Sequence, residues 1–176
     1  NTAWLASTTP ADHEWSAVAW SPELGRFCAV AATGTGGRVM TSEDGVIWTA
    51  RTSAADNDWR SLCWSAPHGL FCAVSSSGSG NRVMTSPDGI VWTSRTSAAD
   101  NQWLSLCVSP ERGLFCAVAA SRRGDRVMTS PDGIVWTLRA TPADHEWRGI
   151  VWAAELGLFV AVAAGGDENR VMTSPD

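Results

Sequence analysis

The sequence predicts an all-β fold built from four repeated sheets, and three observations support this prediction. The motif Arg-Val-Met-Thr-Ser-Pro-Asp-Gly-Ile-Val-Trp, at residues 126–136, recurs with a period of 44 residues, and four periods make the full 176 residues. Each period consists of short apolar runs rich in Val, Ile, Trp and Phe, separated by Gly, Pro, Asp, Asn and Ser, which is the pattern of strands joined by turns. No segment shows a helical period long enough to compete.

The second repeat shows how each period divides into four strands. We expect strands at 59–65, 70–76, 82–86 and 90–95, with an Asp-Gly step before the last that is a strong signal for a tight hairpin. Four strands in a repeat of about 40 to 45 residues are typical of one blade of a β-propeller. The sequence therefore predicts a single four-bladed β-propeller domain over residues 1–176, with blades at about 8–51, 52–95, 96–139, and 140–176 completed by 1–7.

The strands carry apolar side chains on both faces, so each sheet must be covered on both sides. Stacking one sheet against the next achieves this. A short hairpin in the second repeat predicts that Trp64 faces Phe71, that Cys63 faces Cys72 and that Leu62 faces Ala73. Small residues recur on the first strand of each repeat and suit an innermost strand near a central axis: Ala17, Ser61, Ser105 and Gly149.

The phase of the repeat predicts how the ring closes. The fourth copy of the motif stops at Asp176, and the missing Gly-Ile-Val-Trp has its counterpart in Asn1-Thr2-Ala3-Trp4. Residues 1–7 therefore align with the absent fourth strand of the last blade. Pairing them beside 170–174 of the same chain would remove a strand edge and close a four-bladed ring, which is the arrangement we expect. Between chains, the same pairing would build a larger ring or an open filament.

The segments Ser-Glu-Asp-Gly-Val-Ile-Trp and Ser-Pro-Asp-Gly-Ile-Val-Trp resemble the Asp-box (BNR) repeats of sialidase-like and photosystem-assembly-factor-like β-propellers. The usual Asp box has one more residue between Asp and Gly, so this is a shortened variant. In that family the box is a structural turn between the third and fourth strands, so the resemblance, which covers all 176 residues, implies a fold rather than an activity. The structural residues it implies are Ser42, Asp44, Gly45, Trp48, Ser86, Asp88, Gly89, Trp92, Ser130, Asp132, Gly133, Trp136, Ser174, Asp176 and Trp4.

Composition narrows the classes of function. A net charge of −5 provides no basic field for nucleic acid, and no apolar run predicts membrane insertion. The absence of Tyr excludes a sialidase-type Tyr nucleophile, and the absence of Lys excludes Schiff-base chemistry. No metal-binding or phosphate-binding motif appears, so we expect no catalytic residues, no metal and no cofactor. The chain has neither a signal peptide nor an initiator Met, which fits a processed product or an excerpt of a longer array.

Five cysteines leave two interpretations open. Cys63 with Cys72, and Cys107 with Cys116, are predicted cross-strand neighbours that could form two disulfides in an oxidising compartment. Alternatively they are reduced core thiols, because Ala and Val stand at the equivalent positions of other repeats. The odd count leaves Cys28 unpaired in the first interpretation.

One loop carries the candidate ligand site. Before the first strand of each blade, an invariant Asp is followed by His or Asn and then, two residues later, by Trp. A carboxylate, an amide or imidazole and an indole face together suit a sugar, and four equivalent sites would give avidity. The alternative is turn scaffolding by Asp and Asn, with the Trp as filler between blades. The candidate residues are Asp12, His13, Trp15, Asp56, Asn57, Trp59, Asp100, Asn101, Trp103, Asp144, His145 and Trp147.

A second recurring polar position precedes the third strand of each blade, at Arg38, Arg82, Arg126 and Arg170. A recurring Arg suits anion recognition, but a structural bond to the Asp-box turn or its neighbour is the simpler expectation.

These observations favour a non-enzymatic recognition module, extracellular or at the cell surface, that binds a glycan in the manner of a lectin or binds a protein surface. The alternative is a structural subunit of an extracellular filament or larger ring, self-associating by strand donation between chains. A glycoside hydrolase is a third candidate, since a ring could still bring two carboxylates together.

Overall fold

The computed structural model describes residues 3–121, 125–166 and 168–175. Within them, four antiparallel sheets contain all the regular secondary structure, and each sheet corresponds to one repeat. Sheet I consists of β1 (Trp15–Ser21), β2 (Arg26–Ala31), β3 (Val39–Ser42) and β4 (Thr49–Arg51); sheet II of β5 (Trp59–Ser65), β6 (Leu70–Ser75), β7 (Val83–Ser86) and β8 (Thr93–Arg95). Sheet III consists of β9 (Trp103–Ser109), β10 (Leu114–Ala119), β11 (Val127–Ser130) and β12 (Thr137–Arg139); sheet IV of β13 (Trp147–Ala153), β14 (Leu158–Ala163) and β15 (Val171–Ser174).

The register within each sheet confirms the predicted hairpins. Trp64 pairs with Phe71, Cys63 with Cys72, and Leu62 with Ala73, as expected from the short turn after β5. The same register recurs in the other sheets, where Cys107 pairs with Cys116. A register shift follows the Trp that opens the first strand in each sheet, so this Trp lies outside the regular alternation.

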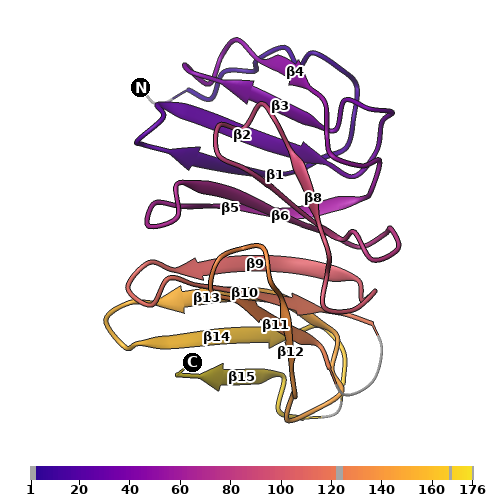
Figure 1. The fold of residues 1–176 in the computed structure, drawn as a ribbon, viewed down its shortest axis with the longest axis vertical. Coiled ribbons are helices and arrows are strands. Elements are labelled where there is room, and N and C mark those ends of the chain that lie inside the picture. The colour runs from indigo at the N-terminus through magenta and orange to yellow at the C-terminus, as the bar shows by residue number, and fades with distance from the viewer. Residues whose placement is uncertain (1–2, 122–124, 167, 176) are drawn as a thin grey trace.

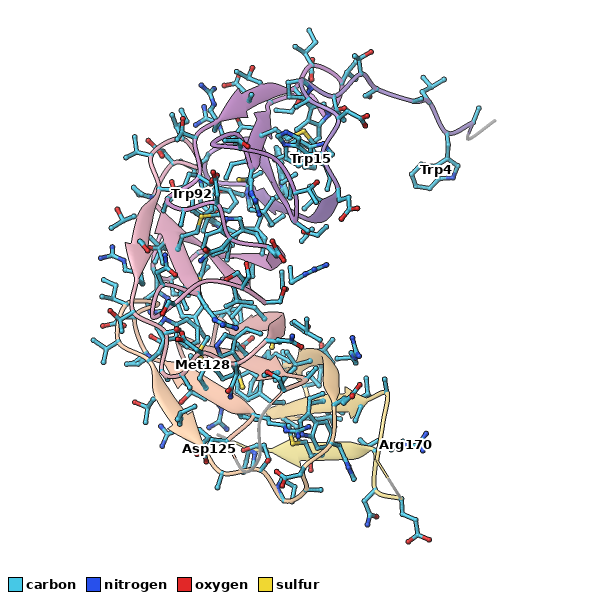
Figure 2. The ribbon with its side chains drawn as sticks, turned by 90° about the vertical axis from the view of Figure 1, so that its right-hand side faces the viewer. Trp4, Trp15, Trp92, Asp125, Met128 and Arg170 are labelled. Carbon is cyan, nitrogen blue, oxygen red and sulfur yellow. The ribbon has the colours of Figure 1, made fainter. Side chains whose placement is uncertain are left out.

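The four sheets stack face to face in chain order (Figure 1). The first strands contact one another from sheet to sheet, β1 with β5, β5 with β9 and β9 with β13, which confirms that they line the inner side of the stack. Viewed at right angles, the stack curves into an open arc (Figure 2).

The core lies between consecutive sheets, and its composition repeats with the period of the sequence. Between sheets I and II, the buried cluster contains Cys28, Val30 and Val39 of sheet I, and Trp59, Leu62, Phe71, Ala73, Met84 and Trp92 of sheet II. Forty-four residues further on, the same positions form the cluster between sheets II and III, including Cys72, Phe115 and Trp136. Each interface is therefore made of one face from each neighbouring sheet, as the two-sided apolar pattern predicted.

The turn before the fourth strand differs from the predicted tight hairpin. In sheet II, β7 and β8 pair with Thr85 opposite Thr93, so residues 87–92 lie in the turn and the fourth strand begins later than expected. The Asp88 carboxylate accepts hydrogen bonds from the amides of Ile90 and Val91, and Gly89 has a φ of 73°. Because one side chain satisfies two successive amides, the chain forms a wide turn instead of a two-residue loop.

The predicted closure within the chain does not occur in the structure. Residues 3–7 belong to no strand, Trp4 is fully exposed, and β15 pairs only with β14. Figure 2 shows the segment that carries Trp4 extending from one end of the arc, while Arg170 lies at the other. Sheets II and III lie between sheets I and IV, so residues 3–7, which precede sheet I, do not reach β15. Residues 1 and 2 and Asp176 lie outside the described residues.

Candidate functional site

In the predicted ligand-binding loops, most of the candidate side chains contact other parts of the same chain. The rings of Trp59, Trp103 and Trp147 are completely buried between sheets, so in these three copies no ring face is open for a sugar to stack on. The indole nitrogens of two of them turn back onto the loop: Trp59 Nε1 donates to Ala55 O at 3.1 Å, and the equivalent bond of Trp103 is 3.0 Å. Trp147 Nε1 is buried without a hydrogen-bond partner among the described residues. The ring of Trp15 is half-buried.

The polar residues of these loops brace the loop between the second and third strands. Asn57 is buried and donates to Asn81 O at 2.8 Å, and Asn101 Nδ2 makes the equivalent bond to Asp125 O. His13 and His145 pack directly against Gly34 and Gly166, at distances that leave no room for a Cβ. The bonds of the two Asn side chains fit the scaffolding alternative, in which Asp and Asn shape turns rather than bind ligands.

The aspartates of the same loops join one repeat to the previous one. Asp56 Oδ1 accepts from the amide of Gly36 and Asp100 Oδ1 from that of Gly80, both at 2.7 Å. Asp144 also has an interaction partner, whereas Asp12 is exposed at the open end of sheet I.

The recurring arginines make structural bonds across sheet boundaries, although not to the Asp-Gly turn. Arg82 Nη1 donates to Ser76 O and to Asn101 O, both at 2.9 Å, and so links its own sheet to the loop that enters sheet III. Arg126 makes the same link to His145 O, and Arg38 instead reaches the Asp58 carboxylate at 3.1 Å. Arg170, in the last sheet, is exposed and donates to Gly166 O.

In the three complete copies, the Asp-Gly turn is held by hydrogen bonds among its own residues. Ser42, Ser86 and Ser130 each donate to the following Asp and accept from the Gly amide, and the indoles of Trp48, Trp92 and Trp136 donate to the carbonyls of Gly45, Gly89 and Gly133. Hydrogen bonds from Ile47, Val46 and Ser42 hold the pKa of Asp44 below its usual range. For Asp88 and Asp132, partial burial raises the pKa, but the two amide bonds and the serine hydroxyl outweigh it and the pKa is again lowered.

All five cysteines are free thiols, so the two possible disulfides are not formed. Cys63 and Cys72, and Cys107 and Cys116, are cross-strand neighbours as expected, but they lie in the apolar interior. Burial raises the pKa of each thiol, that of Cys116 to about 12, which keeps the reactive thiolate scarce. These contacts match the alternative of reduced core thiols.

The two ends of the arc expose apolar side chains that are buried inside it. We call the face of sheet I that points away from sheet II the head face, and the face of sheet IV that points away from sheet III the tail face. Val18 on the head face is 61% exposed, whereas its counterparts Leu62 and Leu106 are 7% and 5% exposed. On the tail face Val162 is 50% exposed, and its counterpart Val118 is completely buried. The sequence does not reveal these residues, because their exposure depends on the ring being open.

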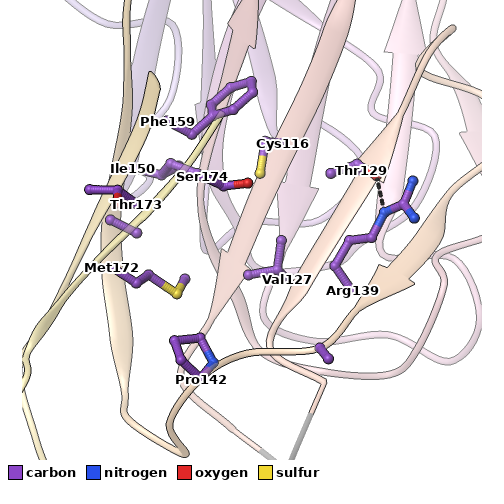
Figure 3. A pocket seen from close by; sticks show the side chains of 12 residues that line it. Cys116, Val127, Thr129, Arg139, Pro142, Ile150, Phe159, Met172, Thr173 and Ser174 are labelled. Carbon is purple, nitrogen blue, oxygen red and sulfur yellow. Dashed lines mark hydrogen bonds between the residues drawn. The ribbon is translucent and has the colours of Figure 1, made fainter. Parts of the chain in front are cut away.

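A cavity of about 170 Å³ lies between sheets III and IV. Figure 3 shows Cys116, Val127 and Thr129 on one side of it and Ile150, Phe159 and Met172 on the other. Arg139 borders it and donates through Nε to the Thr129 hydroxyl at 2.9 Å. The wall is therefore mostly apolar, with a few polar groups at its edge.

The described ranges contain neither a metal-binding cluster nor a membrane-spanning helix. No group of three or more His, Cys, Asp or Glu side chains there is placed to hold a metal ion. No helix in that part of the chain is long and apolar enough to cross a bilayer.

Comparison with known proteins supports the fold. No protein-family model matches the sequence, and no curated protein matches it. Solved structures do match: a chain of a nidogen/laminin complex (TM-score 0.68, 13% identity, 92% of this chain and 60% of that one), the GH74 enzyme of Niastella koreensis (0.71, 15%, 91% and 28%) and a streptogramin B lyase (0.68, 10%, 94% and 55%). The chain thus spans less than two thirds of each of these structures. At such identities the likeness concerns the fold alone: the chain has a repeated fold of the β-propeller type.

Proposed function

We propose that the chain is a non-enzymatic interaction module that binds further copies of itself head to tail, the head face of one copy packing on the tail face of the next. The observation that carries this proposal is the exposure of Val18 and Val162 at positions that are buried at every sheet boundary inside the arc. Fully burying a valine side chain is worth about 1.5–3 kcal/mol, so two such faces favour association.

The boundaries inside the arc supply the geometry of this contact. At the boundary of sheets I and II, Val30 and Val39 meet Leu62 and Phe71. Sheet IV carries Val162 and Val171 at the positions of Val30 and Val39, and both are exposed. Sheet I carries Val18 and Phe27 at the positions of Leu62 and Phe71. The two ends of the arc are therefore complementary to each other, and a head-to-tail contact yields a ring or an open filament according to whether the rotation closes.

Two charge substitutions test the proposal because they block opposite faces. We expect Val18→Asp and Val162→Asp each to be monomeric in sedimentation at concentrations where the wild-type chain associates. An equimolar mixture of the two should form a 1:1 complex and nothing larger, since each retains the face that the other has lost. Val91→Asp, in the exposed turn of sheet II, is the matched control and should associate like the wild type.

Two results would count against this function. One is a wild-type chain that remains monomeric at all concentrations. The other is a mixture of Val18→Asp and Val162→Asp that forms no complex, which would mean that any wild-type association does not use a head-to-tail contact.

A further inference from the structure

The cavity between sheets III and IV is the place that a tryptophan fills at the other two boundaries. In sheet II, Trp92 is buried in the cluster with Cys28, Val39 and Phe71. In sheet III, Trp136 is buried in the cluster with Cys72, Val83 and Phe115. A further 44 residues along, the same wall positions are Cys116, Val127 and Phe159, and all three line the cavity.

The turn glycine confirms this equivalence. A Cβ on Gly89, three residues before Trp92, would lie 3.4 Å from Phe71 and Thr41 and 3.6 Å from Cys28. The counterparts of these three neighbours are Phe159, Thr129 and Cys116, which border the cavity. The space therefore has the shape of a Gly-x-x-Trp segment, and the described residues of sheet IV form three strands that do not fill it.

We infer that this cavity is a binding site for an indole, and that its ligand is Trp4 of a second copy, whose residues 3–7 pair with β15. The inference rests on the proposed head-to-tail contact, which places the two partners together. Residues 3–7 precede β1 in the chain just as β12 precedes β13. When the head face of a second copy covers sheet IV of the first, residues 3–7 of the second copy therefore lie at the edge of β15 of the first.

The donor segment already lies in the position of a fourth strand. Residues 6–10 border a groove with Val46, Ile47 and Trp48 of sheet I. At the boundary of sheets II and III, the equivalent groove lies between residues 94–97 and Ile134, Val135 and Trp136. Residues 94 and 95 belong to β8, so residues 6 and 7 lie against sheet I as the fourth strand of a preceding sheet would. Ser7 Oγ adds a hydrogen bond to Gly45 O at 3.3 Å.

A polar pair at the ends favours a second copy as the partner. Trp64 Nε1 donates to Glu23 across the boundary of sheets I and II at 2.7 Å, and Trp152 Nε1 donates to Glu111 across that of sheets III and IV at 2.8 Å. The next pair in this series joins Trp20, on the head face of one copy, to Glu155 at the tail end of another. Both residues are exposed, at opposite ends of the arc.

Trp4→Ala tests the site without risk to the fold, because the side chain is fully exposed in the single chain. We expect this variant to associate about 30-fold more weakly or worse than the wild type, the effect of losing an aromatic anchor at an interface. A synthetic peptide of residues 1–9 should bind Trp4→Ala in titration calorimetry and should inhibit association of the wild type. The same peptide with Ala at position 4 should do neither, and Val91→Ala is the control variant.

Placing a charge in the wall locates the peptide. Met172→Glu, on the edge strand β15, should abolish peptide binding while circular dichroism still shows a folded β protein. Its thermal stability should fall, because Met172 packs against the core between sheets III and IV.

The outcomes separate this inference from the proposed function. Equal association of the wild type and Trp4→Ala would leave head-to-tail assembly standing and overturn the indole site. A monomeric wild type would overturn the assembly. In that case peptide binding to Trp4→Ala would still support a site filled in trans, and no binding would overturn it. A monomeric wild type that binds the peptide more weakly than Trp4→Ala would show that the chain fills its own site, which would also overturn the inference.

Discussion

At the scale of the residue, the polar groups that recur in every repeat serve the backbone. The Asp88 carboxylate satisfies two amides of its own turn, and the Asn57 amide satisfies a carbonyl of a neighbouring loop. The sequence indicated that these residues belong to turns, since Asp and Asn favour such bonds. It could not show that the following Trp ring is buried, because burial depends on the next sheet covering it. Repetition alone was therefore a weak signal for a ligand site.

The aspartates of the turns predict how stability depends on pH. Their pKa values are lower in the folded chain than in the unfolded one, so they stabilise the fold above the unfolded value of about 3.9, and this contribution is lost as the pH falls through the folded values. We expect the free energy of unfolding in urea to decrease from about pH 5 downwards.

Replacing one of these carboxylates measures its contribution to the free energy of unfolding. Asp88→Ala removes the acceptor for Ile90 and Val91 and should cost about 1 kcal/mol at pH 7. The variant should also lose less stability than the wild type on acidification to pH 3. An unchanged acid dependence would show that other groups control it.

At the scale of the element, the four sheets are equivalent in register but differ at their boundaries. Strand pairing followed from the sequence because each hairpin turn is short and the apolar alternation fixes which residues face each other. The length of the fourth strand did not follow, because Asp88 bonds its own turn and delays the strand to Thr93. The cross-boundary bond from Trp64 to Glu23 was also unforeseen, since the two residues are 41 positions apart.

The tryptophan and glutamate pairs predict different effects for two similar substitutions. Glu23→Gln weakens a bond inside the arc and should lower thermal stability of the single chain by a few degrees, about 1 kcal/mol. Glu155→Gln should leave that stability unchanged and weaken self-association, because its proposed partner is Trp20 of another copy. Sedimentation and thermal unfolding of both variants check this. Reversed effects, or a change in association from Glu23→Gln alone, would contradict the proposed pairing of ends.

At the scale of the whole molecule, the arc is open because no strand pairing among residues 3–121, 125–166 and 168–175 joins sheet IV to sheet I. The repeat length predicted the number of sheets and their stacking correctly. Closure was predicted because residues 1–7 match the missing fourth strand of the last repeat in sequence. That match carries no information about the distance between sheet I and sheet IV. That distance is set by the rotation accumulated over three boundaries between sheets, which depends on how the side chains pack.

The unpaired edge of sheet IV should be the part of the molecule that is least protected from hydrogen exchange. In dilute solution, amides of β15 should exchange with deuterium faster than those of the equivalent β7 and β11, which are paired on both sides. At concentrations where copies associate, protection of β15 should rise, and that of β7 should not change. Hydrogen exchange at two protein concentrations measures both. Equal protection of β15 and β7 in the dilute chain would contradict an unpaired edge.

The equivalence of the three internal boundaries has a consequence for variation in length. An additional 44-residue period inserted between sheets II and III would meet the same packing surfaces on both sides and would leave the two outer surfaces unaltered. The arc would subtend a wider angle while its adhesive properties were preserved, so fewer subunits would be needed to complete a circle. Subunit length could thus be changed by duplication or deletion of whole periods without redesigning the contact between subunits.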